Sequence, residues 1–251
     1  NNYWTANIYG TYNFKFKEYH DFLILGGAQY EKGNNISLSG FKTDLIFQDV
    51  PSLRTATGDA ILNQYLSHNA TLGYFGRIAY NYQNRYMLES NVRYDGSYVF
   101  SEGNRWGFFP SFSLGWNIHN EKFWAVPQDY ITSLKIRASW GQLGNQNISP
   151  YTDLALMPIN TGKLGWIFQP GGSRPIGYTN APGIINQNLT WETSTTTNIG
   201  TNIGLFNNKL LVDFDLFERL TTDMVGPSAP KPGVLGASVP NSNNATLRTR
   251  G

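Results

Sequence analysis

Three charged residues close together in this sequence have the types and spacing of an acid–base site: Glu89, Arg93 and Asp95. Two carboxylates beside a cation can share proton transfer when they face one substrate. Here they occupy alternate positions in a stretch of alternating polar and apolar residues, which places them on one face of a strand. Arg77 has the same parity in the preceding stretch. Charges on one strand face usually pair across neighbouring strands, so we predict a charged sheet face and no catalytic residue.

The sequence shows no sign of a metal, phosphate or nucleic-acid site. His20, His68 and His119 are scattered without the spacing of a metal-ligand set, and there is no cysteine for a thiolate site or a disulfide. The Gly-Lys pair at 162–163 is followed by leucine, unlike a phosphate-binding glycine loop. A net charge of +2 without a basic run argues against a nucleic-acid partner. We therefore predict no metal, no cofactor and no nucleic acid.

The charged residues belong to a stretch with a strict two-residue period. Between residues 72 and 95 the even positions are mainly apolar or aromatic, and the odd positions hold every charge apart from the break at 83–85. This period predicts two antiparallel strands with unlike faces, joined by a hairpin turn. Tyr80, Tyr82 and Tyr86 stand on the apolar face beside that turn. Tyrosine favours a dry ring with a wet hydroxyl, so the row predicts a membrane interface.

The composition agrees with strands that have one apolar and one polar face. Charged residues make up 14% of the chain, against about 25% in ordinary soluble domains. Aromatic residues reach 15%, and there are 26 glycines. These values fit a transmembrane β-sheet. The longest apolar run, 22–28, is too short for a membrane helix, which needs ~20 residues.

The same alternation predicts strands elsewhere, although the parity of the second one is ambiguous because apolar residues run together. Pro110 predicts a bulge or an irregular start in the strand that contains it. Residues 32–67, 96–105, 141–189 and 221–244 are rich in Gly, Asn, Ser or Pro and are predicted to be loops. Residues 245–251 read as the beginning of a further strand. The other predicted strands are 4–16, 22–31, 106–118, 134–140, 191–205 and 210–218.

The lengths of the predicted connections alternate along the chain. In an up-and-down sheet, every second connection lies at the same end, so the short ones share one end and the long ones the other. Outer-membrane barrels have this asymmetry. The predicted fold is therefore all-β: a portion of an antiparallel up-and-down transmembrane β-barrel, with about eight strands, short periplasmic turns and long extracellular loops. The polar parity is predicted to face the lumen and includes Arg77, Glu89, Arg93, Asp95, Lys135 and Arg137.

Several blocks of the sequence resemble the SusC family of TonB-dependent outer-membrane transporters. They occur in the order found in the family and span nearly the whole chain. The blocks are 76–97, with Gly76-Arg77, Tyr80-Asn81-Tyr82 and Val92-Arg93-Tyr94-Asp95-Gly96-Ser97; Gly103-Asn104-Arg105-Trp106-Gly107-Phe108-Phe109-Pro110-Ser111; 134–146, from Leu134-Lys135-Ile136-Arg137 to Gly144-Asn145-Gln146; Asn188-Leu189-Thr190-Trp191-Glu192-Thr193; and Thr197-Asn198-Ile199-Gly200 with Gly204-Leu205-Phe206-Asn207-Asn208.

The resemblance implies a bacterial outer-membrane importer of large nutrients, either glycans or peptides, and no enzyme. Members work with a SusD-like surface lipoprotein and are driven by the TonB complex. Their barrels have about 22 strands and a plugged lumen. We expect residues 1–251 to be a partial β-barrel domain in outer-membrane lipid, because no plug, TonB-contact segment or closing C-terminal strands can be recognised. TonB would then act through the missing N-terminal part.

A second class of protein stays open at this point. A soluble carbohydrate-binding or carbohydrate-cleaving β-protein would also expose aromatic rings, because these stack on sugars. Detergent partitioning and the presence of two aromatic belts distinguish the two classes.

The long loop 144–189 is the predicted place of substrate or lid contact. It carries Trp166, Phe168 and Tyr178 among glycines. Such rings offer flat apolar faces to the C–H side of a sugar. The same rings could instead pack the loop against its neighbours or against the lipoprotein lid. Three roles therefore remain for them: substrate contact, packing within the receptor, and contact with the lid.

Overall fold

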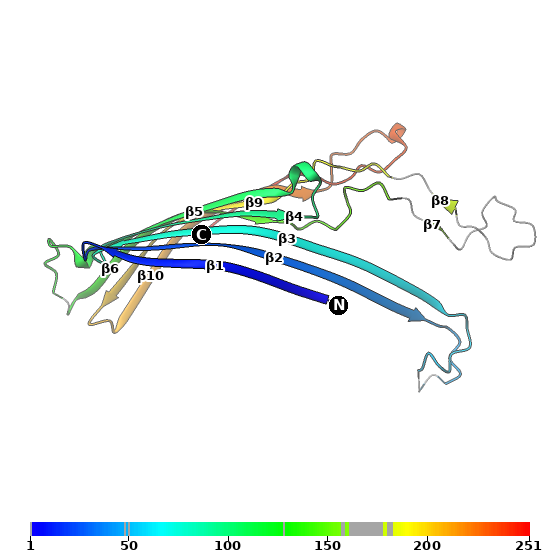
Figure 1. Cartoon of the computed structure of the whole chain (residues 1–251), viewed down its shortest axis with the longest axis horizontal. Coiled ribbons are helices and arrows are strands. Elements are labelled where there is room, and N and C mark those ends of the chain that lie inside the picture. The colour runs from blue at the N-terminus through cyan, green and yellow to red at the C-terminus, as the bar shows by residue number, and fades with distance from the viewer. Residues whose placement is uncertain are drawn as a thin grey trace, which may run out of the picture.

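The alternating stretches form long strands that pair edge to edge in one antiparallel sheet, as the computed structural model shows (Figure 1). The structure describes residues 2–47, 49, 51–127, 129–156, 159–160, 178–179 and 183–251, with the backbone alone for 159–160 and 178–179. Within these residues, the sheet has nine strands. They are β1 (Asn2–Phe16), β2 (His20–Phe41), β3 (Ile61–Tyr82), β4 (Tyr86–Ser97), β5 (Trp106–Asn117), β6 (Ile131–Asn145), β9 (Glu192–Leu205), β10 (Leu210–Gly226) and β11 (Ser242–Arg250).

Small elements lie in the connections. β7 (Ile159–Asn160) and β8 (Tyr178–Thr179) pair with each other outside the main sheet. Three single-turn 3₁₀ helices are η1 (Glu102–Asn104), η2 (Ile118–Asn120) and η3 (Gly233–Leu235). No helix in the described part of the chain is long and apolar enough to cross a membrane.

Strand order in the sheet follows chain order, so the predicted up-and-down antiparallel fold is confirmed. The sheet is open and curved (Figure 1). The ninth strand, β11, develops from the segment predicted as the beginning of a strand and starts at Ser242, before the predicted residue 245.

Short turns gather at one end of the sheet and long connections at the other (Figure 1). The β3–β4 turn has Gln83 and Asn84 at φ of 51° and 55°, and the β9–β10 turn has Asn207 and Asn208 at 56° and 60°. Positive φ at successive turn residues matches the twist of the flanking strands, which explains why such tight hairpins close here. We refer to the two ends as the short-turn end and the long-loop end.

The prediction of a loop over residues 32–67 is wrong for 32–41 and 61–67, and the connection is limited to residues 42–60. β2 continues to Phe41 and β3 begins at Ile61, and the two pair in unbroken register as far as Phe41↔Ile61. They form a hairpin arm that projects beyond β4, whose pairing with β3 ends at Thr71↔Ser97. Backbone hydrogen bonds between the two paired strands run along the whole arm. Because its two faces need not differ in polarity, the alternation that marks the other strands is weak here.

Pairing resolves the parity of β2, which the sequence left ambiguous. Ile24 lies directly between Tyr12 of β1 and Ile78 of β3. Direct partners in an antiparallel sheet share a face, so the even residues of β2 join the apolar face. Leu25 is the partner of Arg77 and lies on the opposite, charged face.

The bulge predicted at Pro110 is absent. β4 and β5 pair without a register shift through Val92↔Pro110. The pairing of β5 with β6 begins one residue later, at Ser111. A proline without an N–H is tolerated at such a position because no ladder bond to the next strand is required there.

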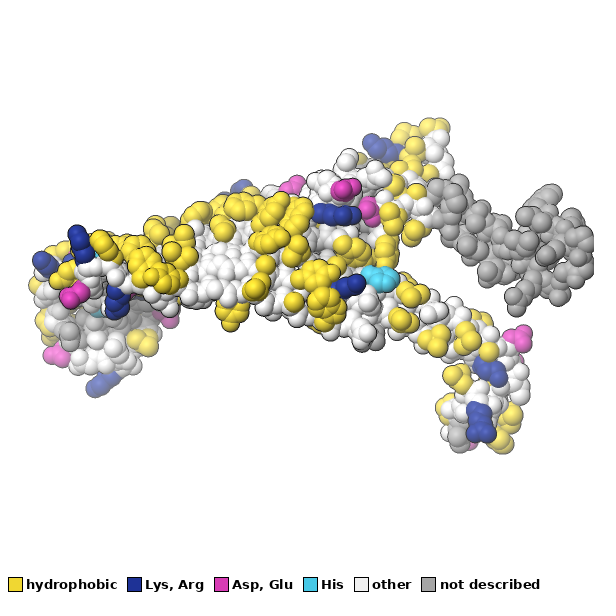
Figure 2. All heavy atoms as spheres, viewed as in Figure 1, with side chains coloured by type: hydrophobic (Ala, Val, Ile, Leu, Met, Phe, Trp, Pro, Cys, Tyr) yellow, Lys and Arg dark blue, Asp and Glu magenta, His cyan; other side chains and the backbone are white. Residues whose placement is uncertain are grey.

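The sheet is a single layer, and most of its large apolar side chains are exposed. Figure 2 shows them gathered in separate groups on one face. This apolar face carries two sets of contacting aromatic rings. The set at the short-turn end includes Phe14–Phe22, Phe22–Tyr80, Tyr82–Tyr86 and Tyr86–Trp116, and the set nearer the long loops includes Trp4–Tyr30, Tyr74–Trp106 and Tyr94–Trp106.

Candidate functional site

The candidate site is the face opposite the apolar one, which we call the charged face. Pairing places all six predicted polar residues on it: Arg77, Glu89, Arg93, Asp95, Lys135 and Arg137. They do not form one cluster. The structure separates five of them into ion pairs along the sheet, each positioned by the register of its strands, and Lys135 is in none of the described ion pairs.

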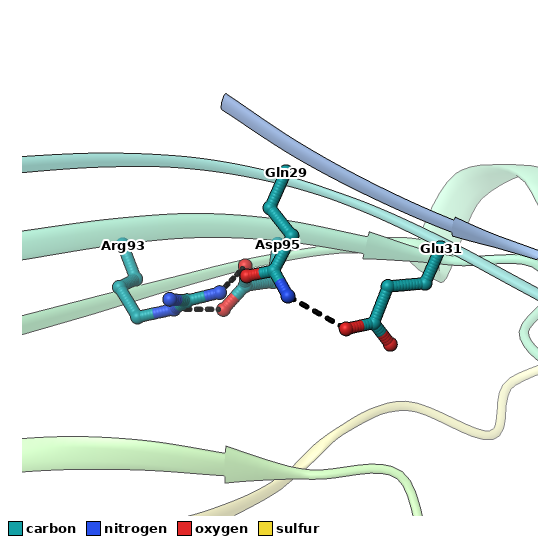
Figure 3. Close-up of polar contacts among 4 residues, drawn as sticks. All are labelled: Gln29, Glu31, Arg93 and Asp95. Atoms are coloured by element: carbon teal, nitrogen blue, oxygen red, sulfur yellow. Dashed lines mark hydrogen bonds and ion pairs between the residues drawn. The ribbon is translucent and has the colours of Figure 1, made fainter. Parts of the chain in front are cut away.

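One polar group lies toward the long-loop end, where Arg93 and Asp95 of β4 approach β2 (Figure 3). Arg93 donates from Nε to Asp95 Oδ2 at 3.0 Å and from Nη2 to Asp95 Oδ1 at 2.8 Å. On β2, Gln29 donates from Nε2 to Glu31 Oε1 at 2.6 Å. The Arg93 charge is therefore matched by Asp95, whereas no described cation forms an ion pair with Glu31.

Gly73 of β3 explains how these groups meet. It lies between Gln29 and Asp95 in the same register row. A Cβ at this position would stand 2.2 Å from Asp95 Oδ1. The missing side chain leaves a shallow channel across β3, in which the carboxylate and the guanidinium lie over the backbone. The absence of a side chain at Gly73 is therefore required for this arrangement of Asp95 and Arg93.

A second glycine makes room for an ion pair farther along the sheet. Arg137 of β6 donates from Nη2 to Asp215 Oδ2 of β10 at 2.6 Å, across the intervening strand β9. Gly200 of β9 is the direct partner of both residues. A Cβ on Gly200 would stand 2.4 Å from Asp215 Oδ1 and 3.0 Å from Arg137 Cζ. Asp215 thus completes a pair of which sequence reasoning singled out only the arginine.

Toward the short-turn end, Arg77 Nη2 donates to Glu89 Oε2 at 2.5 Å, and Asn91 donates to the second oxygen of Glu89 at 2.9 Å. Lys135 lies close to Gly115 on β5 but makes no ion pair within the described residues. A cavity of about 790 Å³ opens beside Glu89, Lys135 and Arg137. Its wall is mixed, with Leu23 and Ala79 beside the charges.

A small apolar core closes the charged face at the long-loop end, and sequence reasoning missed it. Phe100, Phe109 and Trp191 are almost fully buried against one another. The Phe109 ring fits because a Cβ on Gly107 or Gly144 would come within 2.4 Å and 2.0 Å of it. The Gly-Phe-Phe-Pro and Thr-Trp-Glu blocks contain Phe109 and Trp191 and were the available signal, whereas Phe100 lies in neither block.

Hydrogen bonds tie the long-loop end together around this core. Trp191 donates from its indole nitrogen to the carbonyl of Arg105 at 3.0 Å. Ser101 donates to the carbonyl of Gln187 at 2.5 Å. Glu192 is buried and accepts from Asn145 of β6 at 2.8 Å and from the backbone N–H of Val225 at 3.0 Å. The β4–β5 and β6–β9 connections are therefore fixed to each other, and the start of β9 is fixed to the ends of β6 and β10.

A second contact at this end joins β3 to the β6–β9 connection. The Tyr98 hydroxyl donates to the carbonyl of His68, and the ring of His68 hydrogen-bonds the Tyr151 hydroxyl at 2.8 Å. Burial, followed by the interaction with Tyr151, raises the pKa of Tyr98 to about 12. The phenol therefore stays protonated and remains a donor throughout the neutral range.

The predicted loop residues are placed only in part. Trp166 and Phe168 lie outside the described residues, and for Tyr178 the structure gives the backbone of β8 alone. The three histidines lie far apart, on β2, β3 and η2. In the described ranges, no three His, Asp or Glu side chains gather as a metal site.

The curved up-and-down sheet, with aromatic sets on one face and ion pairs on the other, has the architecture of an outer-membrane β-barrel wall. The chain belongs to the TonB-dependent receptor family: the model described as "TonB dependent receptor-like, beta-barrel" matches residues 1–251. It is thus an outer-membrane protein of a receptor and transporter family. This membership favours the importer class over the soluble carbohydrate-binding or carbohydrate-cleaving alternative.

Relatives support the predicted resemblance to SusC. The chain is 33% identical over 246 residues to TonB-dependent receptor P3 of Formosa agariphila, covering 97% of this chain and 24% of the relative. It is 34% identical over 222 residues to TonB-dependent receptor SusC of Bacteroides thetaiotaomicron, covering 87% and 21%. The chain therefore spans about a quarter of the length of these relatives or less.

Solved structures share the fold. The RagAB peptide importer in its closed-closed state superposes with a TM-score of 0.82 at 22% identity, covering 99% of this chain and 26% of that one. The siderophore receptor PirA of Pseudomonas aeruginosa gives a TM-score of 0.53 at 13% identity, covering 98% and 38%. At these identities, the likeness concerns the fold alone.

Proposed function

We propose that residues 1–251 form a central part of the barrel of a TonB-dependent importer of large nutrients, either glycans or peptides. The supporting observation is the division of the sheet into an apolar face with two aromatic sets and a face of ion pairs, in a chain 34% identical to SusC. In this proposal the apolar face contacts lipid and the charged face lines the lumen. The chain itself catalyses no reaction.

The assignment to a TonB-dependent importer also implies its protein partners. A SusD-like surface lipoprotein would cover the long-loop end, outside the cell, and the TonB complex would act through a plug-bearing segment beyond these residues. The relatives described as SusC and as part of the RagAB peptide importer support this assembly. Arg77, Glu89, Arg93, Asp95, Lys135 and Arg137 would then face the plug or the passing substrate.

The β6–β9 connection is the proposed place of substrate or lid contact. Its ends are fixed by the Phe100–Phe109–Trp191 core and by the Tyr98–His68–Tyr151 contact. We propose that Trp166, Phe168 and Tyr178 contact the substrate or the lipoprotein from this anchored loop. Trp166→Ala with Phe168→Ala in the full-length receptor separates the two roles, because loss of substrate binding with the lipoprotein retained indicates substrate contact.

The central test uses the full-length receptor in its own outer membrane. A tagged receptor is isolated in mild detergent and the proteins that co-purify are identified by mass spectrometry. Uptake of labelled glycans and peptides is then compared in cells with and without TonB. We expect a surface lipoprotein in the complex and uptake only when TonB is present. A receptor that partitions into the aqueous phase, or uptake that does not depend on TonB, would contradict the proposal.

A further inference from the structure

The apolar face has a groove at its long-loop end that import does not require. Its volume is about 230 Å³. Most of its lining comes from outward-facing positions of four adjacent strands, so it opens on the side that contacts the membrane. The outward-facing lining residues are Tyr30 of β2, Ala70 and Leu72 of β3, Gly96 of β4 and Trp106 of β5.

Gly96 shapes this groove. A Cβ there would lie 2.9 Å from the Trp106 ring, so the indole packs directly against the backbone of β4. It is held by stacking on Tyr94, with ring centroids 4.7 Å apart, and on Tyr74 at 6.1 Å. The result is an apolar trough with aromatic walls. Rings of this kind mark the boundary between the hydrocarbon core and the headgroups.

Two cations stand beside the groove. Arg105 contributes to its lining and is exposed, and among the described residues its side chain makes one hydrogen bond, from Nε to the carbonyl of Phe100 at 3.1 Å. Lys32 is two residues beyond Tyr30 on the same face, directly opposite Trp4 of β1. Neither cation forms an ion pair within the described residues.

Carboxylates also lie near the groove, among them Asp153, which acts electrostatically on the lining residue Tyr98. Glu102 of η1 is the exposed carboxylate closest in sequence to Arg105, and it too has no described ion-pair partner. Glu31, the sequence neighbour of Lys32, lies on the opposite face.

We propose that this groove binds a phosphorylated glycolipid of the outer leaflet, with an acyl chain in the trough and a phosphate on Arg105 and Lys32. The trough matches a hydrocarbon chain in polarity, and arginine and lysine bind phosphate through charge-assisted hydrogen bonds. Basic side chains just beyond the aromatic boundary lie at the height of lipid headgroups. The proposal depends on the outer-membrane location and not on the imported substrate.

The test measures lipid retained by the full-length receptor after purification in mild detergent, by native mass spectrometry. Lys32→Gln with Arg105→Gln is compared with Lys15→Gln plus Lys17→Gln, which removes the same charge at the short-turn end. A cation near a lipid surface contributes about 1 kcal/mol, or roughly fivefold in affinity. We expect the first variant to lose about 25-fold in retained glycolipid and the second to match the native receptor.

Further measurements keep folding and ligand chemistry separate from the result. Heat-modifiable migration on a gel checks that each variant is folded, and Arg105→Lys, which keeps the charge, should retain most of the lipid. Rebinding is measured in vesicles that contain the bis-phosphorylated or the dephosphorylated glycolipid, and with inorganic phosphate as competitor. Preference for the phosphorylated lipid supports the proposal. Equal retention by both double variants, or equal binding of the two lipids, overturns it.

Discussion

Arg137 and Asp215 form an ion pair across a strand that belongs to neither of them, with 2.6 Å between Nη2 and Oδ2. Gly200, on the strand between, leaves the space that the two side chains occupy. Gly73, on β3, likewise leaves space for Asp95 and Arg93, which lie on the same neighbouring strand. Glycines on the charged face therefore decide which charges can meet over the sheet.

Adding a methyl group at Gly200 should break the ion pair between Arg137 and Asp215. Gly200→Ala would place a Cβ 2.4 Å from Asp215 Oδ1, so the pair must separate. The pair is over one-third exposed and contributes little by itself, and we expect a total loss of about 1–2 kcal/mol, mainly from the clash. Urea unfolding of the full-length receptor in lipid vesicles measures it. Gly10→Ala, where nothing lies within 4 Å, is the matched control and should be neutral.

The two faces of β4 should differ in their tolerance of charge. Val92 lies on the apolar face between Gly76 and Pro110, and Val92→Arg should cost ~2–4 kcal/mol if it sits near the bilayer midplane. Arg93→Val removes a charge from the opposite face and should impair insertion much less. Folding yields into lipid vesicles compare the two variants. Equal losses would show that the faces are assigned wrongly.

The apolar core at the long-loop end should be sensitive to volume. Gly144→Ala would place a Cβ 2.0 Å from the Phe109 ring, and overpacking of this kind costs about 1–3 kcal/mol. We expect the β4–β5 and β6–β9 connections to become more susceptible to limited proteolysis. Gly103→Ala, in η1 with open space around it, should leave the digestion pattern unchanged. Identical patterns for both variants would mean that the core does not anchor these connections.

The short-turn end should depend on pH through Glu121. Hydrogen bonds from Tyr86 and then Trp116 lower the pKa of this carboxyl below 4.5, and the Trp116 bond measures 3.0 Å. A lowered pKa means that the ionised form stabilises the folded state. This stabilisation is complete above about pH 4.5 and is lost as the pH falls through the lowered value. The stability difference between the native receptor and Glu121→Gln, measured by urea unfolding at several pH values, should therefore vanish in acid. A difference that does not change with pH would refute this role.

The sequence by itself determined the strands, their unlike faces and the up-and-down order. Alternation is a local property, because successive side chains on a strand point to opposite sides. It can be read directly from the sequence in stretches such as 72–95. Short turns such as 206–209 can likewise be recognised from their residue types. The assignment to the receptor family also rested on local blocks of sequence.

Tertiary structure alone decided what register and cross-strand packing control. The parity of β2 was settled by the pairing of Ile24 with Ile78, and the β2–β3 arm by strand pairing in a stretch where side-chain alternation is weak. Asp215 became the partner of Arg137 only through Gly200. Phe109 and Trp191, both within conspicuous motifs, could not be recognised as a core, because they meet across strands far apart in the chain.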